Sequence, residues 1–214
     1  MNRAVKYFLA TPLVALAVYT FHATSQPISA PVRAQLISSH HWQSGCPVPL
    51  SGLRVLTVSF WGFDKRTHTG QMVVNANAVA PLTTVFRTLY AMRFPIRHMQ
   101  LSDIYGKEPA DGDVTASMEC RQSVPSPCTG GTKSGHWSMH AYGLAVDINP
   151  VENPYVGCGQ TRDKTAVSYM NRARVRPGMV TTAVVAAFRS VGWGWGGSWS
   201  GSTKDYMHFS STGH

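Results

Sequence analysis

The residues with the clearest capacity for chemistry lie at positions 138–147, SMHAYGLAVD, where a histidine and an aspartate stand on either side of a glycine. Residues 144–149 alternate in a way that predicts a short strand, with Asp147 pointing away from a buried face. Gly143 permits a sharp turn, so His140 can fold back over the Asp147 carboxylate. An imidazole and a carboxylate held side by side are typical metal ligands.

The third ligand is expected near the C-terminus, in residues 205–210, DYMHFS. Alternation predicts a second short strand beside the first, with Met207 and Phe209 pointing inward and His208 on the polar face. Two imidazoles and one carboxylate hold zinc with a fourth position open for water, whose pKa falls to about 7. The predicted zinc ligands are His140, Asp147 and His208.

A proton acceptor for this chemistry is Asp205, three residues before His208 and on the turn expected to enter the strand. From there its carboxylate can lean over the metal without binding it, so we assign it as general base and then proton donor to the leaving amine. Ser138 is expected to face the pocket beside His140, where its hydroxyl either binds substrate or stabilises the turn. His136 makes an i, i+4 pair with His140, but the glutamate of HExxH is missing, so it is not assigned as a ligand.

These motifs, SxHxxGxAxD at residues 138–147 and acid-x-x-His ending at His208, resemble those of the zinc D-alanyl-D-alanine carboxypeptidases of the VanY type. Flanking segments at 149–155 and 192–197 are similar to secreted actinobacterial members. The superfamily also contains lysostaphin-type peptidases and the hedgehog signalling domain. The resemblance extends from Ser44 to the C-terminus and implies a small central antiparallel sheet with flanking helices, which carries the metal on its exposed face.

The resemblance also implies a residue that binds the substrate's free carboxylate. In the family this is thought to be an arginine in a Cys-Arg context, which Cys120 and Arg121 match here. A planar guanidinium suits the task because it makes paired hydrogen bonds. Relatives tend to have Phe-Asn before this pair, whereas Met118 and Glu119 stand here, so a negative charge lies near the anion site. A surface arginine paired with Glu119 is the alternative.

All four cysteines lie beyond the N-terminal apolar run, and none has the CxxC spacing of a metal site, so two disulfides are expected. Three pairings are possible from the residues alone. Relatives tend to carry cysteine at the places of Cys46 and Cys120, so the resemblance favours Cys46 with Cys120 and Cys128 with Cys158. A local link between Cys120 and Cys128 is the competing alternative.

Residues 1–25 have the pattern of a secretory signal peptide, with two basic residues before an apolar run and no acid. Cleavage is expected after residue 25 or after residue 34, and an uncleaved membrane anchor is the alternative. Residues 26–44 predict a linker, and residues 45–214 predict one zinc peptidase domain. The protein is therefore expected to be exported and associated with the cell wall.

The net charge and the charged-residue content indicate which binding partners to expect. The chain has a net charge of +9, and charged residues make up only 14% of it, below the roughly 25% usual for soluble domains, so the excess comes from scarce acids. There is no basic helix, zinc-knuckle spacing or aromatic RNA-binding pattern, which argues against a nucleic-acid partner. An anionic cell-wall surface is the expected partner. A basic balance with no partner is the alternative.

Strand and helix patterns follow one another in a mixed order that predicts an α+β domain, with helices packed on a small antiparallel sheet. Strands are expected at 53–60, 71–74 and 96–101, the first two as a hairpin. Apolar residues at three- and four-residue spacing predict helices at 77–92 and 177–191. Both apolar stripes are expected to form core.

Residues and resemblance together imply an exported zinc peptidase that hydrolyses the terminal D-Ala-D-Ala bond of peptidoglycan stem peptides, with Asp205 as base and Arg121 as carboxylate anchor. The nearest alternative is an endopeptidase with the same zinc site that cuts within the stem, for example between L-Ala and D-Glu, and needs no arginine anchor. The other alternative is a non-catalytic, zinc-stabilised domain that binds the cell wall. Such a domain would not depend on Asp205.

Overall fold

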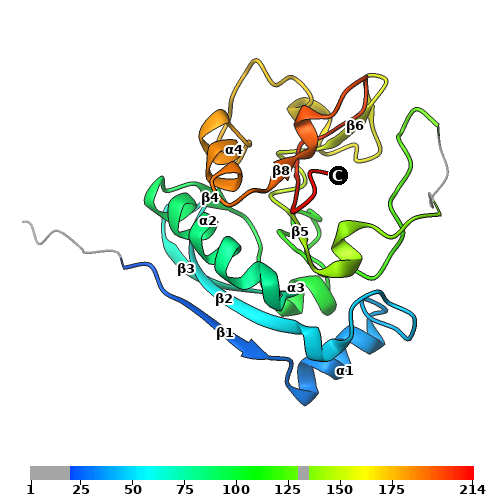
Figure 1. Ribbon diagram of the computed structural model, residues 1–214. Helices are drawn as coiled ribbons and strands as arrows, with labels where there is room; N and C mark the ends of the chain where they lie inside the picture. Colours follow the sequence, from blue (N-terminus) through cyan, green and yellow to red (C-terminus); the bar gives the residue numbers. More distant parts are fainter. Residues whose placement is uncertain (1–19, 130–134) are drawn as a thin grey trace, which may run out of the picture.

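A computed structural model describes residues 20–129 and 135–214 of the chain. The fold is α+β, with helices packed on small antiparallel sheets, as the sequence predicts (Figure 1). Among the described residues, no helix has the length and apolar character needed to cross a membrane. The strands are β1 (Ala23–Pro27), β2 (Leu53–Gly62), β3 (Thr67–Asn75), β4 (Pro95–Ile96), β5 (Ala145–Asp147), β6 (Tyr155–Gly157), β7 (Gln160–Thr161), β8 (Gly194–Trp195), β9 (Lys204–Asp205) and β10 (His208–Ser210). The α-helices are α1 (Ala30–Ser38), α2 (Val79–Ala91), α3 (Leu101–Tyr105) and α4 (Thr182–Arg189).

The largest sheet has the antiparallel order β1-β2-β3, and the short strand β4 pairs with β2 in parallel. The predicted hairpin is confirmed, with Leu53 of β2 opposite Asn75 of β3. Strand β3 begins at Thr67, earlier than expected, because the turn is confined to a few residues. Lys65 adopts φ +61° there, and the Asp64 carboxylate accepts the Arg66 N–H.

Helices α2 and α4 lie side by side over the core (Figure 1). Helix α2 packs against the largest sheet through residues at three- and four-residue spacing, as predicted. Phe188 of α4 stacks on Phe209 of β10, with ring centroids 3.7 Å apart, and both side chains are fully buried. One apolar core therefore joins the largest sheet to the small sheet that contains β10.

The prediction of a strand at residues 96–101 is wrong. Only its first residue, Ile96, belongs to a strand, and residues 101–105 form helix α3. Between them the backbone bonds to two different segments, since Gln71 N donates to Met99 O and Thr115 N donates to His98 O. Bonds to two separate neighbours do not form the regular ladder of one strand pair.

Two small sheets carry the polar side chains of interest. One has the order β5-β10-β8, and its register sets His208 opposite Asp147, so the predicted strand neighbours are confirmed. The other has the order β7-β6-β9 and sets Asp205 opposite Tyr155. Asp205 therefore lies in a strand of its own, rather than on a turn directly before His208.

The N-terminal segment differs from its prediction. The leader remains a prediction, since residues 1–19 lie outside the described residues, and the cleavage positions 25 and 34 fall inside β1 and α1. The expected linker, residues 26–44, contains the end of β1 and all of α1, and Leu36 is fully buried. The serine and proline that indicated a linker instead begin a helix, because the Ser29 hydroxyl caps α1 and a proline lies in its first turn.

The two disulfides have the pairing that the resemblance favours, Cys46 with Cys120 and Cys128 with Cys158. The first disulfide links Cys46, which follows α1, to Cys120, the residue before Arg121. A backbone hydrogen bond from Cys120 N to His41 O, 3.0 Å long, strengthens the same junction. The N-terminal segment is thus fastened to the stretch that carries Arg121.

Candidate metal centre

His140 lies on a single turn of 3₁₀ helix, Met139–Tyr142, whose two ends are fixed by the sequence. The Ser138 hydroxyl caps the turn by accepting the His140 N–H at 3.3 Å, and Gly143 ends it with φ +63°. A Cβ on Gly143 would lie 2.6 Å from the backbone N of Asn75, so only glycine lets the turn dock against the end of β3.

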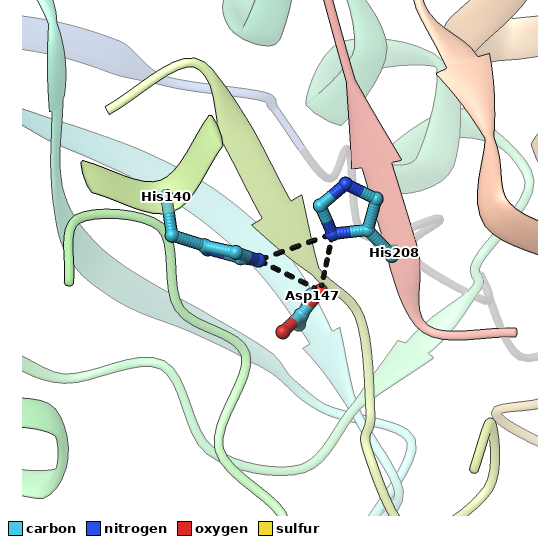
Figure 2. A group of neighbouring side chains, drawn as sticks. All are labelled: His140, Asp147 and His208. Atoms are coloured by element: carbon cyan, nitrogen blue, oxygen red, sulfur yellow. Dashed lines mark hydrogen bonds and ion pairs between the residues drawn. The ribbon is translucent and has the colours of Figure 1, made fainter. Parts of the chain in front are cut away.

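The imidazole of His140 meets the other two predicted ligands (Figure 2). Its Nδ1 donates to the Ser117 carbonyl oxygen at 2.7 Å, which leaves Nε2 as an acceptor. Nε2 lies 3.2 Å from Asp147 Oδ1 and 3.1 Å from His208 Nδ1. The triangle closes with 3.3 Å between His208 Nδ1 and Asp147 Oδ1.

The three donor atoms fit a metal ion. Zinc in a tetrahedral site lies about 2.0–2.2 Å from each nitrogen and oxygen, which separates neighbouring donors by roughly 3.4 Å. The observed edges of 3.1 to 3.3 Å are close to that value. Two nitrogens and one carboxylate oxygen are also the donors that zinc accepts at catalytic sites. His140, Asp147 and His208 could therefore hold the ion.

The neighbouring imidazoles favour the ionised form of the Asp147 carboxyl group. Burial alone would raise the pKa of Asp147, but His140 and His208 outweigh it and hold that pKa far below its usual value. Burial likewise opposes a charge on His140, yet the Asp147 carboxylate raises the pKa of this imidazole. Asp147 thus remains a carboxylate throughout the neutral range, which a metal ligand must be.

Asp205 lines the same cavity as the three ligands. Its Oδ1 is buried and has no hydrogen-bond partner within residues 20–129 and 135–214. Burial raises the pKa of Asp205 to about 7, and the negative charge of Asp147 acts in the same direction. A carboxyl group with such a pKa can both accept and release a proton near neutral pH.

A cavity of about 530 Å³ lies over the centre, and Arg121 forms part of its wall. The Arg121 Nε donates to a Glu119 oxygen at 2.6 Å, and Nη1 donates to the Gln122 carbonyl at 3.3 Å. The third nitrogen, Nη2, has no hydrogen-bond partner in the described part of the chain. Arg121 thus lines the cavity and is also paired with Glu119.

The other residues singled out in the sequence differ in their positions relative to the cavity. Ser138 lines it while its hydroxyl caps the helical turn. His136 is not part of the metal-binding group formed by the described residues. Trp193 is buried in the core, whereas Trp199 lines the cavity 5.9 Å from the His208 ring. Met207, expected to point inward, also lines the cavity.

Sequence reasoning missed several residues of the site. Ser117 orients His140 through its backbone carbonyl, for which no side-chain pattern exists. His214 lines the cavity because the last residues fold back, with Trp199 Nε1 donating to Gly213 O at 2.6 Å. Tyr155 reaches the cavity from β6. The tryptophans between residues 193 and 199 fit either an aromatic wall beside the site or core packing in the sequence, and Trp199 lines the cavity.

The segment that holds this centre is similar to a known family. Residues 131–211 match the model of a family described as D-alanyl-D-alanine carboxypeptidase. The matched segment includes the three candidate ligands and Asp205, but neither Arg121 nor the largest sheet. No curated protein and no solved structure matches the chain. The match supports a peptidase of this carboxypeptidase type.

A buried network of one arginine and two carboxyl groups supports the loop that follows β5. Arg97 contacts both carboxyl groups, with Nε 2.9 Å from Asp113 and Nη2 2.9 Å from Glu152. Asp113 Oδ1 also accepts the Val151 N–H at 3.0 Å. Burial, reinforced by the neighbouring Glu152 carboxylate, raises the pKa of Asp113 to about 8.

This pKa predicts a pH dependence of stability. Asp113 in the unfolded chain has a pKa of about 3.9, so the native protein binds more protons between about pH 4 and pH 8. The stabilising contribution is therefore complete at acid pH and is lost as the pH rises through about 8. Asp113→Asn is expected to flatten the fall in Tm between pH 5 and pH 8, measured by thermal denaturation. The exposed Asp163→Asn should keep the wild-type slope, and an unchanged slope in Asp113→Asn would contradict the assignment.

Proposed function

We propose that this protein is a zinc peptidase that hydrolyses the terminal D-Ala-D-Ala bond of peptidoglycan stem peptides. The observation that carries the proposal is the triangle of donor atoms on His140, Asp147 and His208, with edges of 3.1 to 3.3 Å. It borders a cavity that Asp205 and Arg121 also line. The family match over residues 131–211 supports the same class of reaction.

Zinc held by the three ligands would polarise the scissile carbonyl and make water a better nucleophile. Asp205 takes a proton from the attacking water as the oxygen–carbon bond forms. It then gives this proton to the amine nitrogen as the carbon–nitrogen bond breaks. The raised pKa of Asp205, about 7, suits both steps. A non-catalytic binding domain would give no role to the buried, unpartnered Oδ1 of Asp205.

Arg121 is the proposed anchor for the terminal carboxylate of the peptide. Its Nη2 is available for a charge-assisted hydrogen bond, while Glu119 occupies Nε. The Nε edge of the guanidinium is therefore taken, and the proposed contact with the carboxylate uses the Nη2 end.

A second function with the same centre is favoured by one observation. A further cavity of about 570 Å³ is also lined by His140 and Asp147. A peptide that continues beyond the scissile bond in both directions would find room on both sides of these ligands. An endopeptidase that cuts within the stem is therefore the second candidate.

The same proposal includes an exported protein that acts at the cell wall. Two disulfides support it, since they persist in oxidising compartments. The net charge of +9 supports attraction to an anionic wall. The proposed partners are stem peptides and the wall surface, without nucleic acid, and a membrane only if the predicted leader is retained.

The test is mass spectrometry of a synthetic stem pentapeptide ending in D-Ala-D-Ala, incubated with the zinc-loaded protein. Release of one D-Ala is expected, and a chelator should abolish it. Arg121→Gln should raise the KM for this peptide roughly tenfold or more, as expected for a lost charged hydrogen bond. Arg33→Gln, on the exposed face of α1, should leave the KM unchanged.

A second peptide with its C-terminal carboxylate blocked as an amide separates the two candidate functions. A carboxypeptidase should lose most of its activity on the amide, whereas an endopeptidase should cut both peptides at an internal bond. An intact pentapeptide under zinc-replete conditions would contradict the carboxypeptidase. Cleavage of whole peptidoglycan at an internal bond would then favour the endopeptidase.

A further inference from the structure

The second cavity beside the metal centre has an unusual lining. It shares His140 and Asp147 with the first cavity, but Arg121 does not line it. None of its described lining residues is a lysine or an arginine, although the chain as a whole carries 19 of these residues. The carboxylates in its lining therefore have no lysine or arginine beside them in the lining, although the protein as a whole is basic.

Four of the ten acidic residues of the chain line this cavity: Asp103, Glu108, Glu119 and Asp147. Two of them already have partners, since Asp147 contacts the two imidazoles and Glu119 binds Arg121 at 2.6 Å. Asp103 and Glu108 make no ion pair with any described residue. Their charges remain available to a ligand.

A buried hydroxyl in the same wall also lacks a partner. The Ser117 side chain is only 1% exposed, and its Oγ makes no hydrogen bond with the described residues. Ser117 lines this cavity together with the acidic residues, and its carbonyl already orients His140. A buried hydroxyl without a partner costs free energy unless a ligand or water satisfies it.

We infer that this cavity is a subsite for a primary ammonium group on the peptide substrate. An ammonium is a compact cation with three donors, which suits two carboxylates and one hydroxyl acceptor. The inference rests on the proposed function, which sets the direction in which the bound peptide runs between the two cavities. With the terminal carboxylate at Arg121 in the first cavity, the part of the peptide before the scissile bond crosses His140 and Asp147 into the second. The group bound there is a side-chain amine on a residue before the scissile bond.

The experiment compares two peptides that differ only in this amine: N-acetyl-Lys-D-Ala-D-Ala and the same peptide with its side-chain amine acetylated. Calorimetry measures their binding to zinc-loaded protein carrying Asp205→Asn, which prevents turnover. The free amine is expected to bind roughly fivefold more tightly, as two partly exposed ion pairs permit. This preference should shrink at 0.5 M salt. Adding Asp103→Asn and Glu108→Gln should remove it.

Asp64→Asn is the matched control, since it removes one acid at the exposed β2–β3 turn, away from both cavities. It should keep the preference. Equal binding of the two peptides, or a preference that survives the added Asp103→Asn and Glu108→Gln substitutions, overturns the subsite. Cleavage of both peptides by the Asp205-containing enzyme with no preference overturns the subsite alone. Amine-selective binding without any cleavage supports the subsite and contradicts the proposed function.

Discussion

Asp205→Asn is expected to lower kcat for the stem pentapeptide by roughly 10²- to 10⁴-fold while the bound zinc stays at about one ion per chain. The substitution keeps the shape of the side chain but removes the group that accepts and returns the proton. Asp205 contributes none of the three donor atoms, which lie 3.1 to 3.3 Å from one another, so the metal should remain bound. Steady-state kinetics together with metal analysis of the same sample gives both quantities.

Asp205→Glu is the informative companion, because a longer carboxylate preserves the chemistry and changes only its reach. It should retain much more activity than Asp205→Asn. A kcat for Asp205→Asn within a few-fold of the wild-type value would rule out Asp205 as the base. Loss of zinc from Asp205→Asn would instead make it a ligand, contrary to the assignment.

His208→Ala is expected to abolish both zinc binding and activity. Two donors remain, His140 Nε2 and Asp147 Oδ1, and catalytic zinc needs three protein ligands. In the intact protein, zinc at 100 times its dissociation constant should stabilise the fold by about 2.7 kcal/mol. Thermal denaturation with and without zinc should therefore show a rise in Tm for the wild type and none for His208→Ala.

The control for this substitution is His136→Ala. His136 lies four residues before His140 and resembles a second ligand in the sequence, but it is not in the metal-binding group of the described residues. Its replacement should preserve the zinc content and the zinc-dependent rise in Tm. If His208→Ala bound zinc normally and His136→Ala lost it, His136 rather than His208 would be the ligand.

The ligand strands were predictable because they combine alternation with unusual residue types. The strand pattern around Asp147 defines its exposed face, and the glycine at 143 marks the sharp turn between the first two ligands. Alternation also placed His208 on a strand, and the shared metal chemistry indicated that the two strands pair.

Other features could not be deduced from local patterns. Ser29 and the proline after it fit both a linker and a capped helix, and the burial of Leu36 against distant residues decides between them. The position of Asp205 depends on pairing between β6 and β9, two strands too short to have a sequence period. The acidic wall of the second cavity combines segments near residues 103 and 119, which only the tertiary fold brings together.

The pairing of β1 with β2 protects the protein from self-association through a sheet edge. Strand β1 covers the edge of the ten-residue strand β2 from Arg54 to Val58. A chain shortened past Pro27 would leave these N–H and C=O groups without partners, and such an edge readily accepts a strand from another molecule. The metal ligands lie on separate segments, so edge-to-edge aggregation, rather than loss of zinc, is the failure that such shortening would cause.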